Sequence, residues 1–449
     1  MMSISKRVLL FLISGTLLLL SEHVFGLNYA AVFIVFLATA YFYLSNKLKE
    51  SLFLILLFSA LSQGGLNVFT FSIAGLNLFY FLILTLLFIS VFTKRKQLFT
   101  LSRVSFTYLL LVFFVLTYSI FNFYSSPLFF VKDFIVIVFL PIAFFVLFKN
   151  IENRDILFVI YNIIAIKVIV SLVFYLTGLT LHVEDNLHGA MVVDNADELG
   201  AFFHTLLLSF ILFVKNKNKS WMYLIFIISI AGMFFYGLGF LGLGSQVILM
   251  LLLVFGLYAA RNKFLFVGFV LLLILTAPTL DSIGNDLILF KLKNIIGLFS
   301  NLNWESVYDI PHSPQVRVIE LINILSYPWY NIVFGHGIGG SFTDSYFAFN
   351  SYIGSFDFSE YEIATRDFYN PHNIAFGLLK LGVIWWGFVV HLVYNSISVK
   401  DNELKVFLFV AIFVLLLNFG YAIKSSLLLG LVFIVLHNYQ KVRAFEKAN

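Results

Sequence analysis

The residues best suited to chemistry gather in one polar stretch, Asp281 to Asn373, which interrupts an otherwise lipid-soluble sequence. Three segments within it combine basic, imidazole and glycine residues: Ser313 to Arg317, Phe334 to Gly340, and Asn370 to Asn373. A guanidinium binds phosphate through paired hydrogen bonds, and a neutral imidazole accepts a proton as a general base. We therefore interpret the three segments as one site for a phosphorylated substrate, built by the stretch and by the helices that frame it.

His372 is the predicted catalytic base. Asn370 and Pro371 before it form a helix-start signal, in which the asparagine caps and the proline takes the first helical position. His372 and Asn373 then fall within the first turn, where the positive end of the helix attracts anions and disfavours a protonated imidazole. Asn373 is a predicted substrate contact. The alternative is that His372 is only a polar residue at the membrane interface.

Arg317 is the residue predicted to hold the phosphates. Ser313-Pro314 offers an N-cap and a first helical residue, so we expect Arg317 in the first turn of a helix. A pair with Glu320, three positions further on, is the alternative. Arg366 is a weaker candidate for the same task, because the adjacent Asp367 can neutralise it.

The segment Gly335 to Gly340 reads GHGIGG. Glycine allows the backbone to approach a ligand closely, so His336, Gly337 and Gly339 are predicted to contact the substrate. No strand, crossover helix or following acidic residue accompanies the segment, which excludes a dinucleotide fingerprint. A plain flexible turn is the alternative.

Lys380 lies eight positions beyond His372 within an apolar run, and is expected on the same helix, roughly 12 Å further along it. A charge in such a run must face the bundle interior, a cavity or another charge. Lys380 is therefore predicted either to counter a lipid pyrophosphate or to pair with an acid elsewhere. Lys132 and Asp133, inside another run, are expected to neutralise each other.

The amino-acid composition indicates that membrane-embedded segments position these residues. The chain is 61% hydrophobic and only 11% charged, and its mean hydropathy is +0.99, far outside the range of soluble proteins. With no cysteine, a thiolate nucleophile and a cysteine-ligated metal are excluded. No zinc, hydrolase or nucleotide motif occurs, so we predict no metal and no cofactor. The positive charge lies mostly in short loops, which does not indicate nucleic-acid binding.

Apolar runs recur along almost the whole chain, and about fourteen approach the length needed to span a bilayer as helix. If they alternate, the lysines and arginines between them fall on one face, which is then cytoplasmic, as are both termini. The sequence thus predicts an all-α polytopic membrane protein with about 12–14 transmembrane helices and one long periplasmic loop forming a partly helical cap. The expected domains are the N-terminal transmembrane bundle 1–280, the loop 281–372, and the C-terminal helices with a short cytoplasmic tail 373–449.

In this order and membrane setting, the segments resemble the O-antigen polymerase and ligase superfamily of bacterial envelopes. The resemblance rests on Arg317, on the stretch from Pro328 to Gly340 (PWYNIVFGHGIGG), and on His372-Asn373 with Gly382 further along. Asp194-Asn195, just before the apolar run that begins near residue 199, is similar to the corresponding loop of that family. Many members have a Ser-Arg pair where this chain reads Gly244-Ser245-Gln246, so Lys132, Arg366 or Lys424 would have to replace the family's arginine as a phosphate contact.

The resemblance implies a glycosyltransferase that uses a polyprenyl-diphosphate-linked glycan at the outer face of the bacterial inner membrane, with neither nucleotide nor metal. Polymerisation of lipid-linked repeat units is the first expectation, with undecaprenyl diphosphate as the carrier and a chain-length co-polymerase as a candidate partner. The alternatives are a ligase that transfers finished polysaccharide to a lipid A core, and a membrane transporter or flippase. Arg317 and Arg366 would bind diphosphate, and His372 would act as base.

Overall fold

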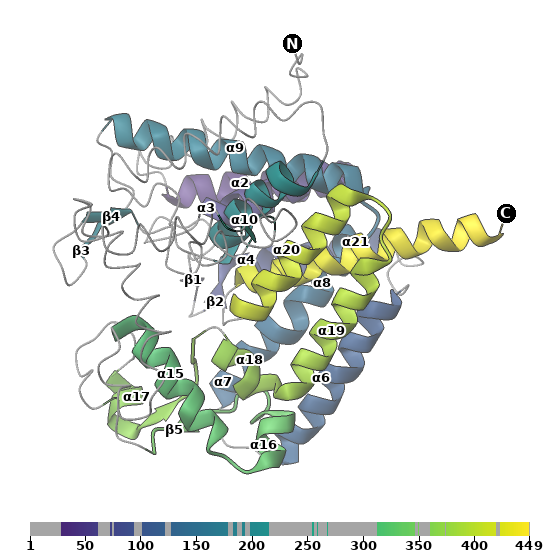
Figure 1. Cartoon of the computed structure of the whole chain (residues 1–449). Helices are drawn as coiled ribbons and strands as arrows, with labels where there is room; N and C mark the ends of the chain where they lie inside the picture. The colour runs from purple at the N-terminus through teal and green to yellow at the C-terminus, as the bar shows by residue number, and fades with distance from the viewer. Residues whose placement is uncertain are drawn as a thin grey trace. The chain divides into compact units, whose positions relative to one another are not determined.

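The computed structural model describes residues 28–61, 72–73, 76–93, 101–121, 127–177, 183–185, 191–193, 198–214, 312–345, 349, 360–372, 374–418 and 423–448, with further positions at 254, 255, 258 and 267. Most of these residues are helical (Figure 1), which confirms the all-α class in its coarse form. Several residues singled out in the sequence lie outside the described residues: Asp194, Asn195, Gln246 and Asn373.

The chain divides into two compact units, each assembled from several segments. Unit 1 comprises Met1–Phe99, Val146–Lys291 and Asp401–Val410, and unit 2 comprises Thr100–Phe145, Leu292–Lys400 and Ala411–Asn449. The division into 1–280, 281–372 and 373–449 concerns position relative to a bilayer, and it stays a prediction. All predicted site residues that the structure describes belong to unit 2.

Unit 1 is a group of apolar helices in which α3 packs against α2 and α9. Lys49 on α3 and Asp155 on α9 form an ion pair of 2.7 Å that is partly exposed. Two antiparallel strand pairs, β1–β2 and β3–β4, belong to the same unit. The elements are α2 (Asn28–Leu44), α3 (Leu48–Leu61), β1 (Ser72–Ile73), β2 (Leu76–Asn77), α4 (Leu78–Thr93), α9 (Asn153–Thr177), β3 (Val183–Asp185), β4 (Met191–Val193) and α10 (Glu198–Phe213).

Unit 2 is built around long apolar helices whose aromatic side chains interlock. Tyr108 on α6 lies with its ring centroid 5.2 Å from those of both Phe388 on α19 and Phe433 on α21, so the three helices share one core. The helices are α6 (Arg103–Phe121), α7 (Pro127–Asp133) continuing through the π-helix η1 (Phe134–Phe139) into α8 (Leu140–Phe148), α18 (Ile374–Leu381), α19 (Val383–Ile397), α20 (Asn402–Asn418) and α21 (Ile423–Ala448). Helices α8 and α20 cross the boundary between the units.

Two helices within the described residues are long and apolar enough to cross a membrane, Arg103–Ile120 and Phe129–Phe148. Helices α18 and α19 pass the same test only as a pair, bent by 111° at the break between them. These helices are those of a membrane protein. The finer expectations of 12–14 spans and of a periplasmic loop stay predictions.

A break at Gly382 divides the apolar run that contains Lys380 into two helices, α18 and α19. Gly382 has a φ of +66°, and a Cβ there would lie 2.3 Å from the carbonyl oxygen of Val333 and 2.4 Å from the amide nitrogen of Gly335. A side chain cannot fit against this crossing backbone, and the left-handed φ favours glycine. The helix therefore ends where the polypeptide after α16 passes over it.

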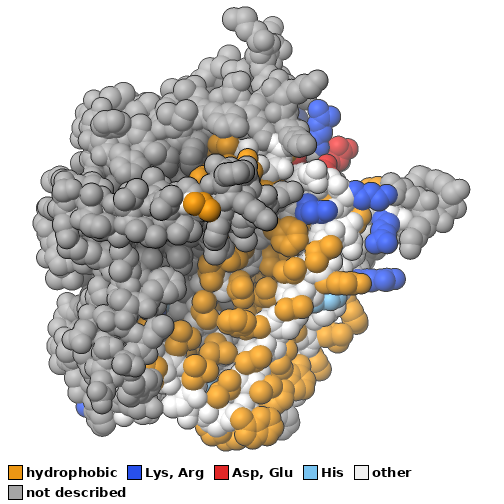
Figure 2. Space-filling view, in the orientation of Figure 1, with side chains coloured by type: hydrophobic (Ala, Val, Ile, Leu, Met, Phe, Trp, Pro, Cys, Tyr) orange, Lys and Arg blue, Asp and Glu red, His pale blue; other side chains and the backbone are white. Residues whose placement is uncertain are grey.

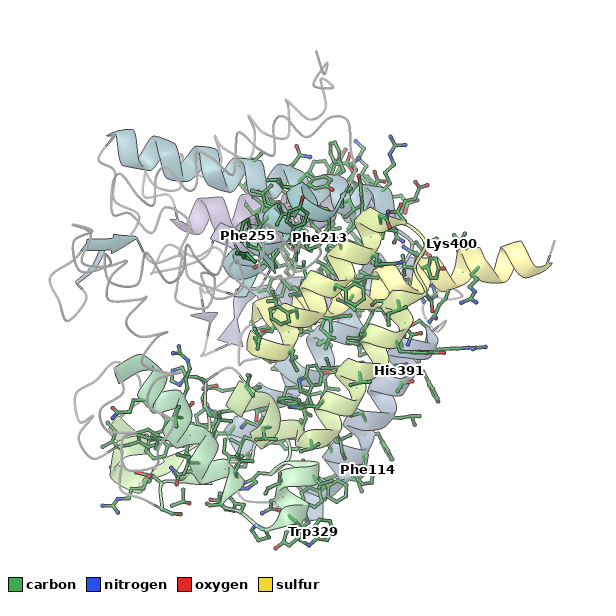
Figure 3. The ribbon with its side chains drawn as sticks, viewed as in Figure 1. Phe114, Phe213, Phe255, Trp329, His391 and Lys400 are labelled. Atoms are coloured by element: carbon green, nitrogen blue, oxygen red, sulfur yellow. The ribbon has the colours of Figure 1, made fainter. Side chains whose placement is uncertain are left out.

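One surface of unit 2 carries a band of exposed apolar side chains (Figure 2). On α6 they are Phe106, Leu110, Phe113, Phe114 and Ile120, and on α19 they are Val383, Trp386, Val390, Tyr394 and Ile397. Trp329 and Lys400 lie at opposite ends of this unit, with Phe114 near the Trp329 end (Figure 3). An apolar band of this kind, with an aromatic residue at one end and basic residues at the other, matches a bilayer and its interfaces.

The described part of the polar stretch, which we call the cap, consists of short helices and one strand pair; its place at the periplasmic face stays a prediction. Its elements are α15 (His312–Leu325), α16 (Trp329–Phe334), β5 (Phe342–Thr343), α17 (Glu360–Thr365) and β6 (Asp367–Phe368). Strands β5 and β6 pair antiparallel, with Phe342 opposite Phe368. Both rings belong to a buried cluster that also takes in Val316 and Ile319 of α15 and Leu379 of α18, so this cluster holds α15 against α18.

Candidate functional site

A contact between α15 and the start of α18 brings two of the three sequence segments together. Glu320 on α15 is fully buried, and its Oε1 lies 2.7 Å from Nδ1 of His372. Its Oε2 accepts a hydrogen bond of 2.9 Å from the backbone N–H of the same histidine. The His372 side chain is 31% exposed. A buried carboxylate therefore holds a solvent-accessible imidazole, although 52 residues separate the two in sequence.

This arrangement corrects one detail of the sequence-based prediction for His372. Helix α18 begins at Ile374, so His372 precedes the helix instead of lying in its first turn. The carboxylate of Glu320 lies at this end of α18, and the binding of a substrate phosphate there stays a prediction. The carbonyl of His372 accepts a hydrogen bond of 3.1 Å from Ala375 N–H, which joins the histidine to the helix.

Arg317 lies on α15, three residues before Glu320, and is partly buried. Residues three apart are neighbours on a helix surface, about 5–6 Å between Cβ atoms. Because α15 begins at His312, Arg317 falls in the second helical turn instead of the first. Glu320, the alternative partner considered for Arg317, directs both carboxylate oxygens to His372. Arg317 and Glu320 are close to one helical turn apart on the same helix.

Lys380, at the end of α18, is fully buried and pairs with Asp133 at 2.7 Å. This confirms the expectation that it pairs with an acid elsewhere, and it corrects the expected neutralisation of Asp133 by Lys132. Nζ of Lys380 also donates to the carbonyl of Gly340 at 2.6 Å. Oδ2 of Asp133 accepts from Gly339 N–H at 2.8 Å. One ion pair thus joins α7, α18 and the glycine-rich turn.

The glycine-rich turn is buried along its whole length, from Gly335 to Gly340, so it is not the flexible turn of the alternative interpretation. Gly337 has a φ of +86°, and a Cβ there would lie 2.2 Å from Oγ of Ser119 on α6. The same Oγ accepts a hydrogen bond of 2.7 Å from Ile338 N–H. Gly337 and Gly339 therefore let the turn pack closely against α6 and α7, and their predicted contact with substrate stays a prediction.

His336 is fixed within this turn. Its backbone N–H donates to the carbonyl of Leu379 at 2.6 Å, and Nδ1 lies 2.6 Å from the carbonyl oxygen of Ser341. Burial lowers the pKa of the imidazole below its usual value, and the nearby Lys380 lowers it further, although the hydrogen bond to Ser341 opposes this. The neutral ring donates through Nδ1–H, so His336 stabilises the turn.

Arg366 and Tyr369 flank the strand β6, Arg366 just before it and Tyr369 just after it on the way to His372. The Tyr369 ring stacks on Phe129 of α7, with centroids 3.6 Å apart, and Nζ of Lys380 is 5.3 Å from its centroid. Burial raises the pKa of Tyr369 to about 12, and the charge of Asp133 contributes to the rise. Arg366 is partly buried with a φ of +58° in the turn before β6. The aromatic ring thus lies over the buried ion pair.

The described residues therefore form two neighbouring clusters, which we call the rim pair and the buried pair. The rim pair is His372 with Glu320, next to Arg317, and the buried pair is Lys380 with Asp133. Sequence reasoning named His372, Arg317 and Lys380 but assigned Glu320, Asp133 and Ser119 no part in the site. An acid inside an apolar run was the available signal for Asp133. Among the residues that the structure describes, no group of three histidines or acids could hold a metal ion.

In comparisons with known proteins, no family model matches the chain, and no curated protein or solved structure is significantly similar to it. The geometry of unit 2 is therefore the basis for any functional assignment. In that geometry a partly exposed imidazole pairs with a buried carboxylate of the helix that also carries Arg317.

Proposed function

We propose that this protein is a membrane glycosyltransferase that polymerises undecaprenyl-diphosphate-linked oligosaccharide repeat units at the periplasmic face of the bacterial inner membrane, in the synthesis of O-antigen or a related surface polysaccharide. The single observation that carries the proposal is the pairing of His372 with Glu320, one helical turn from Arg317. It supplies a base and a phosphate-binding cation to the same small region, next to helices apolar enough to enter a bilayer.

The chemistry requires one proton transfer and one displacement. His372 takes the proton from a hydroxyl of the acceptor sugar, and that oxygen forms a new bond to the anomeric carbon of the donor. The bond from this carbon to the diphosphate breaks, and undecaprenyl diphosphate leaves with the electron pair. Arg317, with Arg366 as a second cation, stabilises the charge that develops on the leaving diphosphate.

The orientation in the membrane follows from the charges at the two ends of unit 2. Basic residues lie where α6 starts, where α19 ends and near the C-terminus of α21: Arg103, Lys400, Lys441 and Arg443. By the positive-inside rule this end faces the cytoplasm. The opposite end, with Trp329 and the cap, then faces the periplasm, and the cap brings the rim pair with it. Both termini are cytoplasmic in this proposal.

The buried pair limits what Lys380 does in the reaction. Its ammonium is wholly buried and bonded to Asp133 and to Gly340, so we assign it to holding the turn and α18 together. The substrate-binding role is left to the partly exposed cations Arg317 and Arg366. The partners that this function requires are the lipid-linked glycan and membrane lipid, and a chain-length co-polymerase would act on the same substrate.

The test is chain extension by the purified full-length protein in liposomes, with a defined undecaprenyl-diphosphate oligosaccharide and with neither nucleotide nor metal added. Extension to longer products supports a polymerase, and transfer only when a lipid A core acceptor is present supports a ligase. His372→Gln should lower kcat by on the order of 10²–10⁴-fold, the usual contribution of a positioned base. His391→Gln, a change of the histidine on α19 labelled in Figure 3, is the matched control and should retain activity.

Two results would overturn the proposal. One is the absence of any glycan transfer by well-folded protein with either acceptor. The other is equal activity of His372→Gln and His391→Gln, which would remove the histidine from the mechanism. Arg317→Lys keeps the charge but loses the paired hydrogen bonds, so it should raise KM or lower kcat more than Lys400→Arg does.

A further inference from the structure

Glu320 makes two hydrogen bonds to a single residue, and these bonds have different requirements. The backbone N–H of His372 is always a donor, and it donates a hydrogen bond of 2.9 Å to Oε2 of Glu320. The ring nitrogen Nδ1 lies 2.7 Å from Oε1, and an ionised carboxylate only accepts. The proton between them must therefore reside on Nδ1. In the neutral ring, the acceptor lone pair is then on Nε2.

We infer that Glu320 is a positioning residue that fixes His372 in the Nδ1–H tautomer and so directs Nε2 toward the acceptor hydroxyl. This inference deepens the proposed function and rests on it for the identity of the hydroxyl. The tautomer itself follows from the contacts of Glu320 alone.

The carboxylate can impose a tautomer because it is itself held rigidly. Its helix, α15, is anchored by Val316 and Ile319 in the buried cluster of the cap. One turn beyond Glu320, the side-chain amide of Asn323 donates to the carbonyl of Ile319 at 3.2 Å, and its carbonyl oxygen accepts from Ser345 N–H at 3.0 Å. A buried carboxylate also needs donors more than an exposed one does, because leaving its oxygens without partners is costly.

Replacing Glu320 by glutamine separates this role from simple packing. A glutamine amide has one oxygen and one NH₂ group, whereas His372 presents a fixed backbone donor and a ring nitrogen to the same side chain. The amide oxygen is required by the backbone N–H, so the NH₂ group faces Nδ1. The ring then has to accept at Nδ1 and carry its proton on Nε2, which is the wrong nitrogen for a base.

The direct test is nitrogen NMR of the full-length protein in lipid, with ¹⁵N-labelled histidine, at a pH where the ring of His372 is neutral. The signal of His372 is identified by its loss in His372→Gln. We expect the wild-type ring to carry its proton on Nδ1 and the Glu320→Gln ring to carry it on Nε2. A wild-type ring protonated on Nε2, or an unchanged tautomer in Glu320→Gln, would overturn the inference whatever the activity.

The kinetic test uses the chain-extension assay with Asp344→Asn as the matched control. Asp344 is another buried carboxylate of the cap, which accepts from Asn323 and from Phe349 N–H. Glu320→Gln should reduce kcat by on the order of 10²-fold or more with little change in KM, and Glu320→Asp should recover part of the loss. Asp344→Asn should not reproduce this split between kcat and KM.

The outcomes separate the two proposals. If His372→Gln is inactive but Glu320→Gln retains the wild-type kcat, the inference about Glu320 is wrong and the proposed function stands. If no variant transfers glycan and the wild type does not either, the proposed function fails, while the NMR result still decides the tautomer.

Discussion

The buried pair of Asp133 and Lys380 allows a quantitative prediction about stability. Both side chains are fully buried and 2.7 Å apart. Lys380→Met keeps most of the side-chain volume but, among the described residues, leaves the Asp133 carboxylate with the Gly339 N–H at 2.8 Å as its hydrogen-bond donor. Asp133→Asn leaves the ammonium with the Gly340 carbonyl at 2.6 Å. Removing one member of a buried pair leaves an uncompensated charge, and the expected loss is about 3–5 kcal/mol for each single variant.

The double variant Asp133→Asn with Lys380→Met removes both charges together. Its expected loss is smaller than either single loss, because replacing both members of a buried pair is often nearly neutral. The assay is reversible unfolding of the purified protein in mixed detergent micelles, with the free energy of unfolding compared across the four proteins of the cycle. Asp155→Asn is the matched control: its ion pair with Lys49 has the same length of 2.7 Å but is partly exposed, so it should cost less than about 1 kcal/mol.

Additive losses in the cycle, or a Lys380→Met protein no less stable than Asp155→Asn, would refute this reasoning. Either result would mean that the charges do not depend on each other, and that the turn and α18 are held by packing alone.

Further variants test the close packing at Gly382 and Gly337 and the burial of His336. Gly382→Ala should destabilise the protein by at least about 1–3 kcal/mol, since it places a Cβ 2.3 Å from a carbonyl oxygen at a φ of +66°; Gly387→Ala, with nothing within 4 Å, should be neutral or stabilising by calorimetry. Gly337→Ala should destabilise the protein for the same reason. Adding Ser119→Ala should restore only part of the lost stability, because Cβ of residue 119 would remain 2.9 Å from the new Cβ; full restoration would argue against backbone strain. Since burial lowers the pKa of His336 below its usual 6.5, the unfolded chain binds more protons below that pH, so stability should fall as pH drops through 6.5. His336→Asn should lack this component in unfolding experiments at several pH values.

Local signals were sufficient for part of the fold. The Pro314 start predicted α15 to within two residues of its observed beginning at His312, because capping is encoded by neighbouring residues. The apolar runs likewise predicted the long helices α6 and α7 to α8, since length and hydropathy decide whether a helix can span a bilayer. The break at Gly382 was missed, because the residues around a glycine in an apolar run do not indicate that another segment of backbone packs against it.

The candidate site was predicted in its residue types but not in its contacts. The i,i+3 spacing left a pair of Arg317 with Glu320 open as the alternative, and Glu320 directs both oxygens to His372. The adjacency of Lys132 and Asp133 favoured mutual neutralisation, whereas Asp133 pairs with Lys380. For Asp133 the nearby residue in sequence was the wrong partner, because burial selects partners that the tertiary fold brings together.

These corrections give the short helix α18 a physical explanation. Eight residues are too few for a stable isolated helix, yet α18 is fixed at both ends by buried carboxylates. Glu320 holds its start through the N–H of His372, and Asp133 holds its end through Lys380. A negative group at the start and a positive group at the end both favour the helix dipole. The two groups differ in solvent exposure and therefore in role. The partly exposed imidazole at the start of α18 can contact a substrate, whereas the buried ammonium at its end stabilises the helix that follows the imidazole.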